Sequence, residues 1–187
     1  MKDLSMTANF NTRLQSTRLV ALLLSAALLF AAVPALSAES AKPESDKPMG
    51  NAAALEGVEE AKTVFLVNLD SAPRAAGFLK AIRGTHKGLL EQDVSSKVVV
   101  VFLGKVVQYL STEPDAELAK EHGESLQSIA ETAAELKALG VRMEVCGAAT
   151  KHFGVDNDTV LGEMEIVGNG FISLIGWQSQ GYVPMTF

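Results

Sequence analysis

One continuous apolar run, rich in β-branched side chains, constrains the fold of this chain more than any other feature. It occupies residues 97–103, reads KVVVVFL, and ends at Gly104. A strand that is apolar at successive positions is buried on both faces, and such strands belong to parallel sheets covered by helices. The run therefore predicts an α/β fold in which helices lie on both sides of a parallel sheet.

Strand and helix patterns alternate along the chain from residue 63 onward. Further short segments with strand character are residues 63–69, 141–146, 165–167 and 182–185. Segments with helical periodicity or helix start and stop signals are residues 74–90, 123–140, 147–153 and 171–180. Together they predict a single-domain three-layer sandwich with a mostly parallel sheet of about five strands. Alternation within the third strand places Val141, Met143 and Val145 on one face.

Residues 1–38 have the features of a secretory signal peptide. Arg13 and Arg18 precede an unbroken apolar run that ends at Pro34, and small residues follow up to Ala38. A positively charged segment, an apolar core and a cleavage site made of small residues, in this order, are the features of a secretory signal peptide. We expect cleavage after Ala38, which gives a periplasmic or secreted protein with no stable membrane insertion. The alternative is an uncleaved signal that anchors the chain, although the run is shorter than the ~20 residues of a spanning helix.

The remainder divides into a linker and a domain. Residues 39–62 hold Pro43, Pro48 and Gly50 among several charges without apolar periodicity, which predicts a flexible linker. Residues 63–187 form the expected folded domain. The formal net charge of the whole chain is −6 and no basic patch stands out, so we expect no binding to nucleic acid.

The single cysteine, Cys146, lies at the end of an expected strand and directly before an expected helix. Ligand sites in parallel sheets gather at the carboxyl ends of the strands, and Asn68 and Gly104 mark two more of these ends. The N-terminus of a helix stabilises a thiolate through free backbone N–H groups and its positive dipole end. This placement makes Cys146 the candidate catalytic residue.

Three neighbours of Cys146 are candidate supporting residues. We expect Gly147 to leave the sulfur uncovered, while Lys151 and His152 lie about one turn further on and add positive charge. The alternative is a structural cysteine, because free Cys is among the most often buried residue types. An exposed thiol in a cleft would favour chemistry, and a thiol sealed under side chains would favour the structural role.

Two segments then carry a family resemblance. Residues 145–155, VCGAATKHFGV, resemble the cysteine segment of the DsrE/DsrF/TusD sulfur-relay proteins. Near the C-terminus, VGNGF at 167–171 and WQSQGY at 177–182 resemble the closing Gly–helix–Gln-Gly-Tyr element of DsrE-like domains. The likeness spans roughly residues 63–187, which is nearly the whole of the expected domain.

The resemblance implies a role as well as a fold. The family fold is a five-stranded, mostly parallel sheet between helices, assembled into oligomers. Cys146 would accept sulfane sulfur as a persulfide and pass it on, as a sulfurtransferase or sulfur carrier without a metal or organic cofactor. A sulfur donor or acceptor protein would be the partner. Family members of the relay work in the cytoplasm, whereas we expect this chain to be exported. The alternative function is a non-catalytic binding or oligomeric assembly module that retains the fold.

The histidines and the apolar C-terminal stretch give two further expectations. The three histidines lack metal-ligand spacing, so we expect no metal site. The C-terminal stretch is more apolar than one small domain needs for its own core, which predicts burial between subunits of a homo-oligomer. Its large side chains are Phe171, Ile172, Ile175, Trp177 and Tyr182.

Overall fold

A computed structural model describes residues 50–186, so the predicted signal peptide and much of the predicted linker lie outside the described residues. Five strands form one sheet, and all pairs of neighbours are parallel. Their order across the sheet is β4-β3-β2-β1-β5. In chain order they are β1 (Glu60–Val67), β2 (Ser95–Phe102), β3 (Arg142–Cys146), β4 (Glu165–Val167) and β5 (Val183–Thr186). The predicted α/β sheet of about five strands is confirmed.

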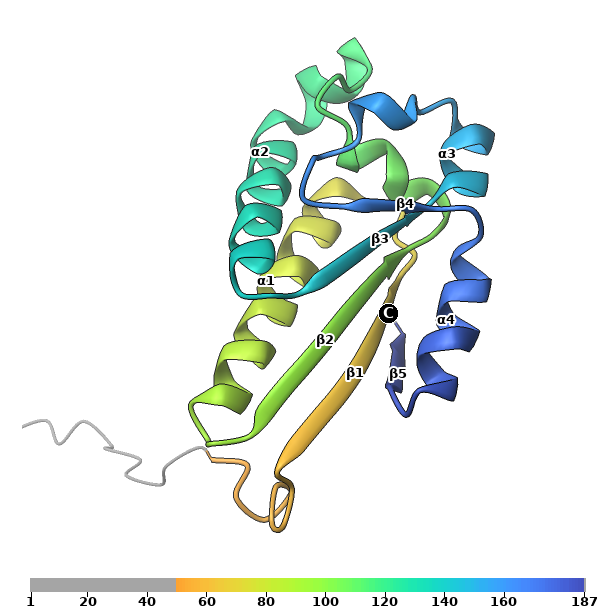
Figure 1. The fold of residues 1–187 in the computed structure, drawn as a ribbon. Coiled ribbons are helices and arrows are strands. Elements are labelled where there is room, and N and C mark those ends of the chain that lie inside the picture. Colours follow the sequence, from red (N-terminus) through yellow and green to blue (C-terminus); the bar gives the residue numbers. More distant parts are fainter. Residues whose placement is uncertain (1–49, 187) are drawn as a thin grey trace, which may run out of the picture. The chain divides into compact units, whose positions relative to one another are not determined.

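Helices cover both faces of this sheet (Figure 1). Helices α1 (Ala72–Leu90) and α2 (Ala116–Ala138) pack together on one face, and α4 (Gly170–Ser179) lies across the other. Two short elements, η1 (Gly104–Leu110) and α3 (Gly147–Phe153), follow the carboxyl ends of β2 and β3, and a 3-10 turn, η2 (Asn157–Thr159), precedes β4. Within residues 50–186, none of these helices has both the length and the apolar character needed to cross a bilayer.

The central strands supply the core in the way their sequence predicts. β2 is buried from Val98 to Phe102, and β1 next to it buries Val64 and Val67. Strand β3 is buried from Met143 to Cys146, and its successive side chains point to opposite faces of the sheet. Its residues Met143 and Val145 belong to the hydrophobic core. The intervening β3 residues face α4, which brings the end of β3 under that helix.

Several elements begin earlier than the sequence patterns predict, and the differences are largest for β1 and α2. β1 starts at Glu60 rather than Thr63, because its first residues already pair with the start of β2. α2 starts at Ala116 rather than near residue 123, since the Asp115 side chain accepts hydrogen bonds from two backbone N–H groups of the first turn. His122 has a non-helical backbone (φ −126°, ψ 18°) and interrupts the helix there.

Candidate functional site

Cys146 is the last residue of β3 and the N-cap of α3, as the sequence predicts. Its burial differs from the expectation, since the residue is only 3% exposed. The expected uncovered sulfur is therefore wrong, because α4 lies over this end of β3. A thiol sealed under side chains was expected for a structural cysteine, so this burial favours the structural role.

The sulfur of Cys146 has one polar partner among residues 50–186. The backbone N–H of Gly170 donates a hydrogen bond to Sγ over 3.3 Å. Gly170 is the first residue of α4, so the positively polarised end of that helix is directed at the sulfur. The contact joins residues that lie 24 positions apart in the chain.

Gly170 approaches β3 so closely that a side chain would not fit. A Cβ built there would overlap Cδ2 of Leu103 and would lie 3.2 Å from Cβ of Cys146. Leu103 is itself buried in the core, so it has little room to move away. The missing side chain of Gly170 is what lets its N–H reach the sulfur.

Three of the predicted residues, Gly147 and the strand-end residues Asn68 and Gly104, lie at the same edge of the sheet as Cys146, and two others do not. Gly147 packs closely against β4, where an added Cβ would lie 3.2 Å from the carbonyl oxygen of Val167. Asn68 and Gly104 meet at the carboxyl ends of β1 and β2, and Gly104 has the positive φ of +70° that favours glycine. These residues share the edge of the sheet at which Cys146 lies.

Lys151 and His152 lie apart from the sulfur. Both are exposed near the end of α3, and the structure over residues 50–186 gives neither of them a hydrogen bond or ion pair with Cys146. The ring of His152 instead meets that of Phe153 edge to face at 4.8 Å. The hydrogen bond to the thiol therefore comes from a backbone N–H group and not from either of these side chains.

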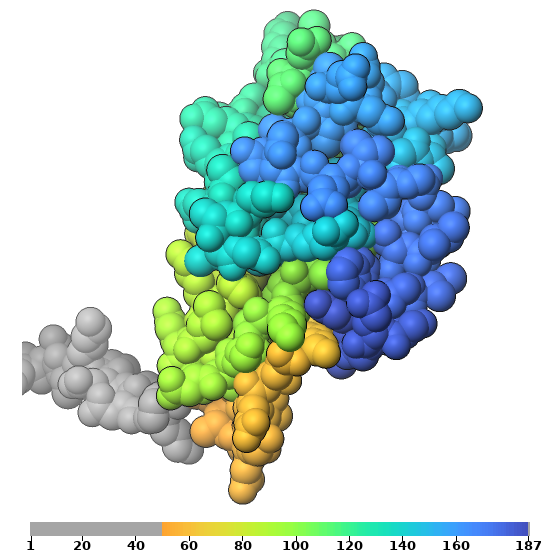
Figure 2. Space-filling view, in the orientation of Figure 1, coloured from red at the N-terminus to blue at the C-terminus, as the bar shows by residue number. Residues whose placement is uncertain are grey.

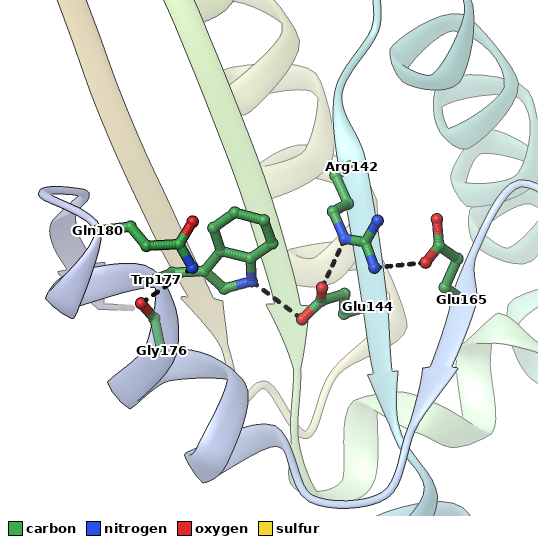
Figure 3. A network of polar contacts seen from close by, with 6 residues as sticks. All are labelled: Arg142, Glu144, Glu165, Gly176, Trp177 and Gln180. Atoms are coloured by element: carbon green, nitrogen blue, oxygen red, sulfur yellow. Dashed lines mark hydrogen bonds and ion pairs between the residues drawn. The ribbon is translucent and has the colours of Figure 1, made fainter.

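A buried carboxylate, Glu144, is the site residue that the sequence analysis did not single out. It precedes Cys146 by two positions on β3 and is 2% exposed. Nε of Arg142 donates to its Oε1 over 2.6 Å, and Nε1 of Trp177 donates to its Oε2 over 3.2 Å (Figure 3). Both carboxylate oxygens thus have a donor, which a charge at this depth requires.

Arg142 connects this carboxylate to the edge of the sheet. Its Nη2 also lies 2.5 Å from Oε2 of Glu165 on β4, and its guanidinium carbon lies 5.7 Å from the centroid of the Trp177 ring. The hydrogen bond to Glu144, together with the charges of Glu144 and Glu165, raises the pKa of Arg142 above its ordinary value. The guanidinium thus pairs with the buried carboxylate of Glu144 on one side and with the exposed carboxylate of Glu165 on the other.

The sequence contains a usable signal for Glu144. It stands in the middle of the strand pattern VRMEVC, and a carboxylate is almost never fully buried unless it is paired. A charged residue inside a strand of this kind predicts a specific partner. The identity of that partner was not predictable, because Trp177 reaches Glu144 only through the path that α4 takes across the sheet.

The C-terminal apolar stretch has two different surroundings. Trp177 and Tyr182 are half-buried, and their rings meet at 5.0 Å. Phe171, Ile172 and Ile175 lie on the outer side of α4 and are 63%, 68% and 66% exposed. Figure 2 shows the C-terminal segment, in blue, as a continuous part of the molecular surface. One side of α4 thus packs on the sheet while the other side presents apolar side chains to solvent.

Comparisons with known proteins found a matching family model and similar solved structures. The family model described as the DsrE/DsrF-like family matches residues 45–187. The structure of MTH1491 from Methanobacterium thermoautotrophicum, a protein of unknown function, is similar with a TM-score of 0.53 at 20% identity, over 68% of this chain and 99% of that one. The ychN protein from E. coli gives a TM-score of 0.48 at 17% identity, over 68% and 99%. Among curated protein sequences, none matches this chain.

Proposed function

The chain belongs to the DsrE/DsrF-like family, and from this membership we propose that Cys146 accepts sulfane sulfur as a persulfide and carries it to an acceptor. The observation that supports the proposal is the hydrogen bond from the Gly170 N–H to Sγ of Cys146. A backbone donor at the N-terminus of a helix favours negative charge on the group that it contacts. Such charge lies on Sγ of Cys146 in the attacking thiolate, and again in the thiolate that is restored when the sulfur is passed on.

The transfer needs no metal, organic cofactor or external oxidant. The Cys146 thiolate attacks the terminal sulfur of a donor persulfide, R–S–SH. A new S–S bond forms on Cys146, the S–S bond of the donor breaks, and the electron pair leaves with the donor thiolate R–S⁻. The proton remains with the transferred sulfur. Attack by an acceptor thiolate on that sulfur then restores the Cys146 thiolate.

Intact mass spectrometry of the protein after incubation with inorganic polysulfide tests the proposal. We expect an adduct of about 32 Da, the mass of one sulfur atom on the thiol. The adduct should be absent from Cys146→Ser, which removes the one cysteine of the chain. Lys151→Ala is the matched control and should load like the unmodified protein, since Lys151 makes no polar contact with the thiol. Loading that occurs only after denaturation would contradict the proposal and favour a structural Cys146.

A separate mass measurement bears on location. We propose that the carrier is exported, because residues 1–38 have the order of charges, apolar residues and small residues of a signal peptide. Protein isolated from the cell envelope should then have the mass of a chain that begins at Glu39. A mass that includes Met1 would contradict export by cleavage and favour the membrane-anchor alternative.

A second candidate function is a non-catalytic assembly module, which the burial of Cys146 and the exposed apolar side of α4 favour. It predicts self-association through Phe171, Ile172 and Ile175, because monomers rarely expose such a cluster. Light scattering at micromolar concentration should give a multiple of the monomer mass, and Ile172→Asp should reduce it to the monomer. Arg74→Asp, on exposed α1 surface, is the control and should leave the oligomer intact. A monomeric unmodified protein would be evidence against this function.

A further inference from the structure

We propose that α4 is a cover over Cys146, and that the hydrogen bond between Trp177 and Glu144 holds this cover closed. The inference rests on the proposed function, since a thiol that is 3% exposed cannot meet a sulfur donor unless something moves. Opening of α4 would expose the thiol while the sheet and the helices on its other face stay in place. Trp177 and Glu144 are thus positioning residues that act through α4.

The inner side of α4 consists of a short line of contacts. Gly170, Leu174 and Trp177 are spaced by four and three positions, so they lie on the same side of the helix. Gly170 donates to the Cys146 sulfur, Leu174 is buried in the core, and Trp177 donates to Glu144. Among residues 50–186, the two hydrogen bonds between α4 and the sheet are made from the first and last of these positions.

Strand β3 presents the matching partners. Glu144 and Cys146 are two positions apart, so their side chains point to the same face of the sheet. Figure 3 shows the Trp177 ring reaching from α4 toward the Glu144 carboxylate. Of the two polar contacts, the one to the carboxylate is charge-assisted, whereas the N–H···S contact is weak. The Trp177 end of α4 is therefore the stronger attachment.

The remaining polar contacts of α4 are internal and would survive its movement. The Asn169 side chain caps the helix by accepting from the N–H of Phe171. The side chains of Gln178 and Ser179 bond to carbonyl oxygens one turn earlier in the same helix. Gly168 and Gly181 flank the helix, and Gly181 has a positive φ of +87°. The helix can thus lift as a unit, at the cost of its two bonds to β3, the contact of the Trp177 ring with Arg142, and the burial of Leu174 and Trp177.

The rate at which iodoacetamide alkylates Cys146 in the native protein measures this opening. Trp177→Phe removes the N–H donor but keeps an aromatic ring, and we expect it to raise the rate about tenfold, as loss of one hydrogen bond to a charged group predicts. Gln178→Ala is the matched control, because the Gln178 side chain bonds only within α4. It should leave the rate unchanged. An unchanged rate in Trp177→Phe would overturn the proposal.

A measurement on the unmodified protein covers the case in which Trp177→Phe fails to fold. Hydrogen exchange by NMR should show that the Gly170 amide and the Trp177 indole N–H open together. Their exchange should be faster than that of the Val100 amide in the central strand, which reports global unfolding. Exchange of all three at the same rate would mean that Cys146 is exposed only by global unfolding, and the cover proposal would be wrong.

These results are separable from those for the proposed function. Alkylation and hydrogen exchange report access to the thiol, and the polysulfide adduct reports sulfur loading. A cover that opens without any polysulfide adduct would leave the present inference standing and contradict sulfur carriage. An adduct that forms at equal rates in the unmodified protein and Trp177→Phe would support sulfur carriage and contradict the cover.

Discussion

Replacing Arg142 with methionine is expected to lower the free energy of unfolding by about 3 kcal/mol, because it leaves a carboxylate buried without its cation. The two members of this ion pair are unequally exposed: the side chain of Arg142 is 42% exposed and that of Glu144 only 3%. Loss of Arg142 therefore affects the buried member. Loss of Glu144 instead leaves Arg142 beside Glu165 and solvent, so Glu144→Gln should cost less.

Urea denaturation of four variants measures this asymmetry. The double variant Arg142→Met/Glu144→Leu should recover most of the loss, because an apolar pair needs no compensation for buried charge. Glu165→Gln is the control for the exposed contact of Arg142 and should change the free energy of unfolding by less than about 1 kcal/mol. Losses of equal size in Arg142→Met and Glu144→Gln would contradict this asymmetry.

The order of elements and the location of Cys146 follow directly from local patterns in the sequence. The run at 97–103 needs only its own composition to predict a buried central strand, and the structure buries Val98 to Phe102 as expected. Likewise, the step from a strand to Gly147 and a short helix predicts that Cys146 lies at the carboxyl edge of the sheet. Each of these features depends on residues that are neighbours in the chain.

The environment of the thiol was not predictable, because it depends on residues that are far apart in the chain. Cys146 is buried because α4 crosses the second face of the sheet. The close approach that matters brings Gly170 of that helix to Cys146 and Leu103, which are distant from it in sequence. Hydrophobic periodicity shows that residues 171–180 form a helix, but it does not show which strand the helix covers. The first turns of α2 were missed because a single capping side chain, Asp115, begins a helix that has no strong apolar periodicity there.

Two glycines of α4 should respond in opposite directions to the same substitution. Gly170→Ala is expected to destabilise the protein by about 1–3 kcal/mol, because the new Cβ would overlap buried Leu103 and press on Cys146. Gly176→Ala is the matched control in the same helix. A Cβ there meets no atom within 4 Å, so alanine should stabilise the protein by about 0.5–1 kcal/mol through its higher helix propensity.

Thermal unfolding of the two variants separates packing against β3 from the stability of the helix itself. If α4 were attached mainly by its own helical stability, both alanines would raise the unfolding temperature. Opposite shifts would mean that the close approach of Gly170 to β3 is required, since the added methyl group is the same in both variants. Gly170→Ala should also speed alkylation of Cys146, because a displaced N-terminus of α4 loses its N–H···S contact. A stabilised Gly170→Ala with an unchanged alkylation rate would show that Leu103 moves aside and that the contact tolerates a side chain.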